Sequence, residues 1–208
     1  MKYVALGDSL TVGVGDILGG GFVPIYRSMA QQYFNRNILL YDIAVSGATT
    51  GDLLVIIKKN KQAREEIRSA NIITISAGGN DLINAAKLYI SKEKKDPFRP
   101  SLSSCKGNFG DLIGIINQLK RESNVPYIIR TMNLYNPFPQ IKMAKHWVKQ
   151  FNLYIAKFQN KCSKMADVYT AFKGNESQLL SADRFHPNGP GYELIAYKLH
   201  QLGYKPLS

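Results

Sequence analysis

The amino-acid sequence predicts an α/β protein in which a parallel sheet of about five strands carries helices on both faces. Five short stretches rich in apolar residues are expected to form the strands, namely residues 2–6, 38–43, 71–76, 125–130 and 166–170. Apolar residues recur at helical spacing between these stretches, and small turn-forming residues follow the first three of them. Because strands that alternate with helices pair in parallel and need cover on both sides, we expect a three-layer α/β/α arrangement.

The helices are expected between and after the strands, as this alternation requires. They are residues 22–34, a helix from about residue 52, residues 110–121, residues 141–164 and a last helix after Gly189. Thr49 or Thr50 is expected to cap the second of these helices, since a hydroxyl can accept a hydrogen bond from a backbone N–H of the first turn.

Residues 85–108 interrupt the alternation. This segment is rich in lysine, contains Asp96-Pro97-Phe98-Arg99-Pro100 and shows no clear period. We expect a variable surface excursion here, either a lid beside a site or a passive insertion. The whole chain, residues 1–208, suits a single domain of this kind.

The net charge, the cysteines and the lengths of the apolar runs favour some classes of protein and argue against others. The formal net charge is +12, which favours anionic surfaces or substrates by long-range attraction. The two cysteines form no CxxC pair, and no His/Cys cluster is present, so the sequence argues against a zinc site or a disulfide framework. No signal peptide and no apolar run near about 18 residues is seen, which predicts a cytoplasmic protein, or an exported one if a signal had been trimmed.

The first strand leads directly into Gly7-Asp8-Ser9-Leu10. Ser9 therefore lies just past a strand end, where the chain turns sharply. A serine hydroxyl is a weak nucleophile unless an imidazole takes its proton, and that imidazole needs a fixed tautomer. Near the other end of the chain, Asp183 and His186 stand three residues apart, close enough for the carboxylate to accept a hydrogen bond from the ring.

Three donors are candidates for stabilising an oxyanion: the backbone N–H of Ser9, the backbone N–H of Gly47 and the side-chain amide of Asn80. Gly47 follows the second expected strand, Asn80 follows the third, and His186 follows the last. In a parallel sheet the carboxyl ends of the strands meet at one edge, where ligands bind. We therefore expect Ser9, Gly47, Asn80 and His186 to gather at that edge.

Four blocks of the sequence together resemble those of the GDSL, or SGNH, hydrolase family. They are Gly7-Asp8-Ser9-Leu10, Gly47, Gly78-Gly79-Asn80-Asp81 and Asp183-Arg184-Phe185-His186, in the same order and spacing. The resemblance implies a flavodoxin-like fold, a nucleophile at Ser9, a triad completed by Asp183 and His186, and an oxyanion hole from Ser9, Gly47 and Asn80. It also implies that no metal takes part, and we expect no cofactor.

The resemblance leaves the substrate open, because the family includes esterases, lipases, lysophospholipases, thioesterases and carbohydrate deacetylases. We expect a serine esterase acting on a small-molecule ester or lipid through an acyl-Ser9 intermediate. Weak contact with an anionic membrane is compatible with the positive charge, and the oligomeric state cannot be read from the sequence.

Other classes of protein fit less well. An α/β-hydrolase needs a G-x-S-x-G elbow in mid-chain, and Ser46 and Ser76 lack its glycines. The glycine-rich residues 13–21 match neither a dinucleotide fingerprint nor a phosphate-binding loop. The alternative from a different class is a non-enzymatic binder of anionic polymer or nucleic acid. No nucleic-acid-binding motif is present, and the basic residues are scattered, so we expect no nucleic-acid partner.

Overall fold

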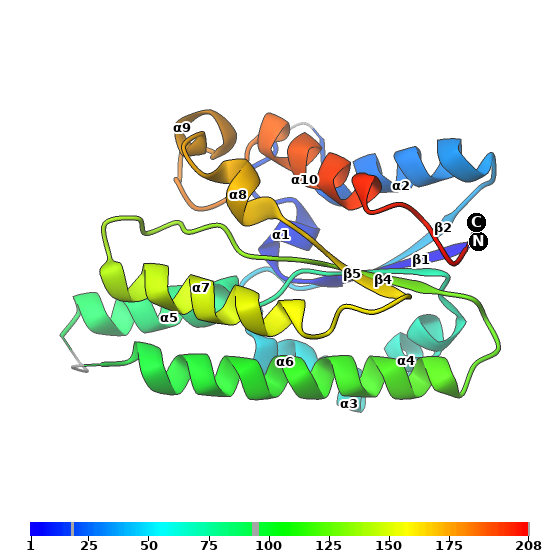
Figure 1. Ribbon diagram of the computed structural model, residues 1–208, viewed down its shortest axis with the longest axis horizontal. Coiled ribbons are helices and arrows are strands. Elements are labelled where there is room, and N and C mark those ends of the chain that lie inside the picture. Colours follow the sequence, from blue (N-terminus) through cyan, green and yellow to red (C-terminus); the bar gives the residue numbers. More distant parts are fainter. Residues whose placement is uncertain (18, 93–95, 208) are drawn as a thin grey trace.

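A computed structural model describes residues 1–17, 19–92 and 96–207. Its centre is one sheet of five parallel strands in the order β2-β1-β3-β4-β5 (Figure 1). The strands are β1 (Lys2–Gly7), β2 (Leu39–Ala44), β3 (Ile72–Ile75), β4 (Ile128–Met132) and β5 (Ser163–Ala166). This arrangement confirms the expected α/β class with a parallel five-stranded sheet.

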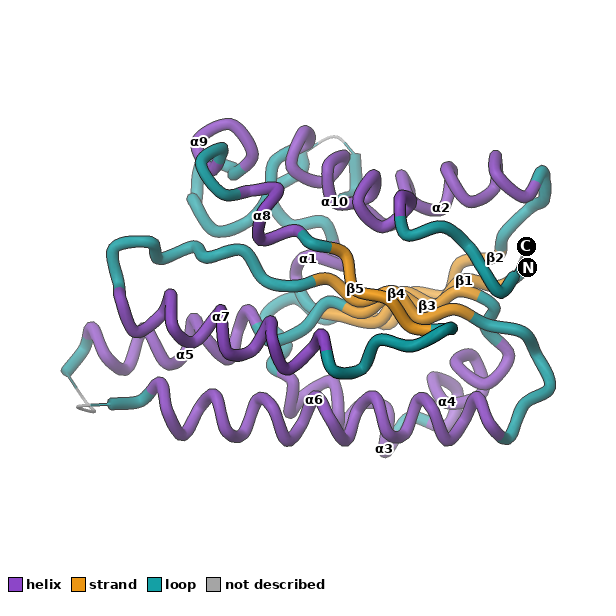
Figure 2. The backbone as a smooth tube through the Cα atoms, in the orientation of Figure 1, coloured by secondary structure: helices purple, strands orange, loops and turns teal. Residues whose placement is uncertain are grey.

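Helices cover both faces of the sheet (Figure 2). On one face lie α3 (Thr50–Lys59), α4 (Lys61–Ser69), α5 (Gly79–Ile90), α6 (Phe98–Arg121) and α7 (Lys142–Ala156). On the other lie α2 (Phe22–Phe34), α8 (Val168–Phe172), α10 (Gly189–Gln201) and the short helices α1 (Ser9–Val12) and α9 (Glu176–Leu179). Two apolar clusters fill the space between sheet and helices, one on each face.

The three central strands are almost fully buried, whereas the edge strands β2 and β5 are only partly buried. A strand with helices on both sides is covered on both faces, which is why β1 and β3 are mostly apolar in the sequence. The carboxyl ends of all five strands point to the same side of the molecule, next to α1 (Figure 1).

Two helix starts follow the sequence closely. α2 spans the expected residues 22–34. Thr49 is the N-cap of α3, and a capping box forms because Asp52 also accepts from the backbone N–H of Thr49. The hydrogen bonds from Thr49 lower the pKa of the Asp52 carboxyl below its usual value.

The expected helix over 141–164 and strand over 166–170 are wrong in their bounds. α7 ends at Ala156, and the side chain of Asn160 then accepts hydrogen bonds from the N–H groups of Cys162 and Ser163, which turns the chain into β5. Residues 168–172 are helical rather than extended, because the Asp167 side chain caps that helix. Apolar periodicity alone could not reveal these polar caps.

Two further bounds differ from expectation. β4 begins at Ile128 rather than at residue 125, since Pro126 has no N–H to give to the ladder. The expected surface excursion over 85–108 is largely helical, because α5 continues to Ile90 and α6 begins at Phe98 rather than at residue 110. Residues 93–95 of this segment lie outside the described residues.

Pro97 and Pro100 are residues typical of a loop in the sequence, yet both lie at the start of α6. Pro97 is the N-cap of the helix and Pro100 lies in the first turn, where no backbone N–H is needed for an intrahelical bond. Cys105 and Phe109 are then buried on the inner face of this helix. Most of the expected excursion is therefore part of a helical layer.

Both cysteines, Cys105 and Cys162, are free thiols, as expected. None of the helices in the described part of the chain combines the length and the apolar character that a membrane span requires.

A buried lysine joins α6 to the end of α4. The ammonium of Lys120 donates to the backbone carbonyls of Arg68 and Ala70, each at 2.7 Å, and lies 5.1 Å from the ring centroid of Tyr127. Burial penalises the charged form and lowers the pKa of Lys120 from 10.5 to about 8. The positive charge lies at the C-terminal end of α4, where the last backbone carbonyls have no hydrogen-bond partner within the helix.

This lysine should give the folding stability a distinct alkaline signature. Between about pH 8 and pH 10 the unfolded chain still holds the lysine proton while the folded protein releases it. The free energy of unfolding should therefore rise with pH relative to Lys120→Met, by about 1–3 kcal/mol across this range. Urea denaturation of both proteins at several pH values measures the difference. A difference that stays constant across this range would contradict the account.

Candidate active site

Ser9 is presented by a tight strand-to-helix turn. β1 ends at Gly7, Asp8 caps α1 by accepting from the N–H of Leu10 at 3.1 Å, and Ser9 is the first residue of that helix. Position 7 has no room for a side chain, since a Cβ there would lie 2.2 Å from Ser76 Oγ and 2.3 Å from Thr11 Oγ1. The glycine thus lets the chain turn against β3 and fixes the place of Ser9.

The Asp8 carboxyl is buried beneath this turn. It is 2% exposed and accepts from Ser76 Oγ at 2.7 Å as well as from Leu10 N. Burial raises the pKa of Asp8, and the two hydrogen bonds partly offset that rise. Ser76 also contacts Thr11 Oγ1 at 2.8 Å, so the turn that carries Ser9 is tied to the chain just after β3.

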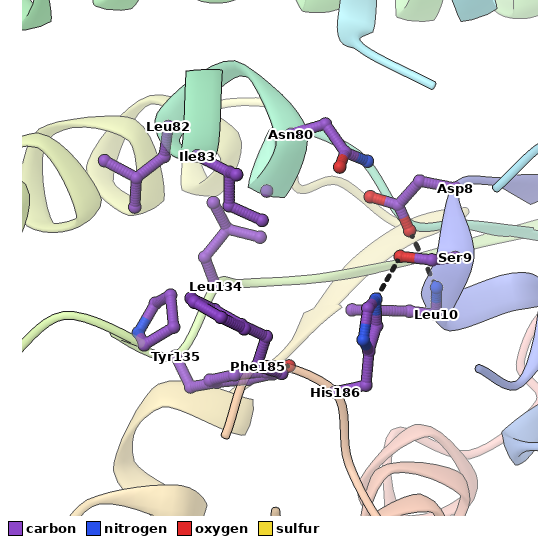
Figure 3. A pocket seen from close by; sticks show the side chains of 12 residues that line it. Asp8, Ser9, Leu10, Asn80, Leu82, Ile83, Leu134, Tyr135, Phe185 and His186 are labelled. Carbon is purple, nitrogen blue, oxygen red and sulfur yellow. Dashed lines mark hydrogen bonds between the residues drawn. The ribbon is translucent and has the colours of Figure 1, made fainter. Parts of the chain in front are cut away.

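The imidazole of His186 connects the two ends of the chain. Its Nε2 lies 2.9 Å from Ser9 Oγ, and its Nδ1 lies 2.6 Å from Asp183 Oδ2. Figure 3 shows the ring directed at the Ser9 hydroxyl. The structure therefore brings the three expected side chains of Ser9, His186 and Asp183 together in one hydrogen-bonded series, within the reach that proton transfer requires.

The loop before α10 holds the Asp183 carboxylate firmly. Its Oδ1 accepts from Ser181 Oγ at 2.8 Å and from the backbone N–H groups of Phe185 at 2.8 Å and His186 at 2.9 Å. Arg184 adopts a left-handed conformation with φ of 59°, which lets the loop curl around the carboxylate. Burial alone would raise the pKa of Asp183, but hydrogen bonds to the charged form hold it well below its usual value.

The three expected oxyanion donors lie on neighbouring turns. The N–H of Ser9 is in the first turn of α1, where it has no intrahelical acceptor. Asn80 lines the same pocket as Ser9 and His186, and its Nδ2 donates to the carbonyl of Ala48 at 2.9 Å. Gly47 precedes Ala48 in the β2–α3 turn, with φ of 83°, a conformation that favours glycine. Gly47 is not among the residues that line the pocket, and the hydrogen bond from Asn80 to Ala48 links its turn to the pocket.

A pair of hydrogen bonds, called the clasp below, joins the start of α3 to α5, and no pattern in the sequence predicts it. Asp81 Oδ2 accepts from the N–H of Thr50 at 2.9 Å, and Oδ1 accepts from Thr50 Oγ1 at 2.8 Å. Burial raises the pKa of the Asp81 carboxyl, and the bonds from Thr50 offset part of that rise. Asp81 stands in the Gly78-Gly79-Asn80-Asp81 block, but its partner lies 31 residues away, so sequence spacing carried no signal of the pair.

The space beside Ser9 is small and mostly apolar. Its volume is about 40 Å³. Its apolar walls are Leu10, Leu82, Ile83, Leu134, Tyr135, Pro137 and Phe185. Within the described residues, no cluster of three or more His, Cys, Asp or Glu side chains could hold a metal ion. The site thus offers a hydroxyl, a base and amide donors next to an apolar space, which are the parts that acyl transfer needs.

The chain matches a known protein family over most of its length. The model of the GDSL-like Lipase/Acylhydrolase family matches residues 5–194. The chain is 36% identical over 206 residues to the spore germination lipase LipC of Bacillus licheniformis, covering 98% of this chain and 97% of that protein.

Solved structures agree as well. The lipase Lip_vut3 from a goat rumen metagenome superposes with a TM-score of 0.93 at 36% identity over 100% of both chains. Axe2, an acetylxylan esterase from Geobacillus stearothermophilus, shares the fold, with a TM-score of 0.74 at 21% identity over 98% of this chain and 94% of that chain.

The low pKa of Asp183 should be visible in acid unfolding. Above about pH 4 the carboxylate is ionised in both states, and the folded state holds it better, so the wild type should be more stable than Asp183→Asn. As the pH falls below about 4, the unfolded chain takes up the proton first and this advantage should shrink. Ser181→Ala removes one of the donors and should show a smaller version of the same trend. Urea titrations that show a pH-independent difference for Asp183→Asn would contradict it.

Proposed function

The chain belongs to the GDSL-like lipase/acylhydrolase family and is an ester-cleaving acylhydrolase, and on that premise we propose that Ser9, His186 and Asp183 form its catalytic triad. The observation that carries the proposal is the pair of distances at the imidazole, 2.9 Å to Ser9 Oγ and 2.6 Å to Asp183 Oδ2. These distances suit an imidazole that takes a proton at Nε2 while a carboxylate holds its Nδ1–H.

The reaction runs in two halves. In the first, Ser9 Oγ bonds to the ester carbonyl carbon as its proton passes to His186 Nε2, and the carbonyl oxygen becomes an oxyanion. The carbon–oxygen bond to the alcohol then breaks, and His186 returns the proton to the departing alcohol oxygen, leaving acyl-Ser9. In the second half, His186 takes a proton from water as that water attacks the acyl carbon. Ser9 leaves with the proton, and a carboxylic acid is released.

The oxyanion is stabilised by the N–H groups of Ser9 and Gly47 and by Nδ2 of Asn80. One N–H of the Asn80 amide is given to Ala48, which leaves the other for the substrate oxygen. This contact also orients the amide before substrate arrives. Losing one such donor typically costs about 2.7–4 kcal/mol of transition-state stabilisation.

The substrates of this mechanism are carboxylic esters. Thioesters and lysophospholipids present the same acyl carbon and suit the same steps. The positive charge of +12 is compatible with weak contact with an anionic membrane surface that holds such a lipid. The alternative of a purely binding protein for anionic polymers explains neither the family membership nor the aligned hydroxyl and imidazole.

Covalent labelling tests the nucleophile. Incubation with an organophosphonate should modify Ser9, located by peptide mass spectrometry. Ser9→Ala and His186→Ala should each slow hydrolysis of p-nitrophenyl acetate by about 10³-fold or more, because nucleophile and base act as one unit. Thermal melting serves as the folding control. A label on another residue, or full activity in Ser9→Ala, would contradict the proposal.

The clasp between Asp81 and Thr50 should affect turnover rather than substrate binding. We expect Asp81→Asn and Thr50→Val to lower kcat about 10- to 100-fold with little change in KM, because the donors on Gly47 and Asn80 lose their mutual alignment in the transition state. Thr50→Ser keeps both donors to Asp81 and should retain activity. If Asp81→Asn lowered the melting temperature but left kcat unchanged, the clasp would be structural only.

A further inference from the structure

Two cavities adjoin each other near Ser9. The small space beside Ser9, about 40 Å³, lies next to a larger one of about 860 Å³ between residues 136–140 and residues 176–185. Two residues, Pro137 and Phe185, line both of them. These two side chains are therefore the partition between the small space and the large one.

The ring of Phe185 is held by its surroundings. It packs edge-on against Phe138, with ring centroids 5.3 Å apart. Its backbone is fixed twice, since its carbonyl accepts from the hydroxyl of Tyr135 and its N–H donates to Asp183 Oδ1. The position of the partition is thus set by the same loop that positions His186.

The space beside Ser9 is much smaller than its neighbour, about 40 Å³ against about 860 Å³. The larger cavity falls in the range of about 300–1,000 Å³ that is typical of sites for sizeable ligands. Leu82 and Ile83, from α5, lie across from Phe185 and close the opposite side (Figure 3).

We propose that Phe185 determines the acyl specificity of the enzyme: its ring ends the acyl space at a short acyl group and shuts off the larger cavity. This inference rests on the proposed acyl-Ser9 mechanism. The larger cavity has apolar surface from Pro137, Phe138 and Leu180 that a longer acyl chain would contact once the ring is removed. Esters of short acyl groups should therefore be hydrolysed in preference to esters of long acyl groups, lysophospholipids included.

The test compares p-nitrophenyl acetate, butyrate, hexanoate and octanoate with the wild type and Phe185→Ala. The wild type should prefer acetate or butyrate. In Phe185→Ala the ratio of kcat/KM for octanoate to kcat/KM for acetate should rise by about tenfold or more, because each methylene that enters an apolar pocket is worth about tenfold or more in discrimination. The backbone hydrogen bonds of Phe185 remain in this variant, and the residue as a whole is already 37% exposed, so the fold should persist.

Two control variants separate the effect of removing the Phe185 ring from the effect of enlarging either cavity alone. Ile83→Ala enlarges the same small space from a wall that does not border the larger cavity, so it should extend the preference by only one or two carbons without the gain on octanoate. Leu180→Ala lines only the larger cavity and should keep the wild-type preference. Melting curves of all three variants confirm that each is folded.

The outcomes separate this inference from the proposed function. A wild type that hydrolyses octanoate as well as acetate, or a folded Phe185→Ala with an unchanged ratio, would overturn the role of Phe185 while leaving the acyl-Ser9 mechanism intact. A wild type that hydrolyses none of the esters and takes no phosphonate label at Ser9 would overturn the proposed function, and this inference with it.

Discussion

The geometry of the site depends on the two hydrogen bonds that the His186 imidazole makes, one to Ser9 and one to Asp183. His186 lies 177 residues from Ser9 in the chain, and nothing local in the sequence could place them 2.9 Å apart. The parallel sheet does so, because β1 lies inside the sheet and every strand delivers its carboxyl end to the same edge. The loop before α10 then returns the chain to that edge. The buried central strands thus set the geometry on which proton transfer depends.

Hydrogen bonds fix the turns that carry the residues of the site. The turn carrying Ser9 is fixed to β3 through Asp8 and Ser76, and the β2–α3 turn is fixed to α5 through Asn80 and Asp81. Each tie uses a buried or partly buried hydrogen bond, which is costly to leave unmade. In the proposed mechanism such ties would keep the oxyanion donors in place before the substrate arrives, so that little reorganisation is needed when charge develops on the oxygen. The same edge of the sheet is therefore both the structural and the chemical centre of the molecule.

The class of fold could be predicted from the sequence because it follows from regular rules, and the sequence also singled out the three side chains that the structure brings into one hydrogen-bonded series. Strand ends meet at one edge, and the chemistry of Ser9, Asp183 and His186 needs only three side chains in recognisable settings. The predicted ends of helices and strands are wrong where polar side chains cap or turn the chain, as at Asn160 and Asp167. They are also wrong where prolines lie at the start of a helix, as at Pro97. The Asp81–Thr50 pair and the partition at Phe185 depend on contacts between distant segments, which no local pattern encodes.

A crystal structure of the protein inhibited by an organophosphonate would test the central claim most directly. The account predicts phosphorus bonded to Ser9 Oγ and His186 still bonded to Asp183. It also predicts the phosphonyl oxygen about 2.7–3.1 Å from the nitrogens of Ser9, Gly47 and Asn80. An oxygen directed away from these three nitrogens, or an imidazole displaced from both Ser9 and Asp183, would contradict it.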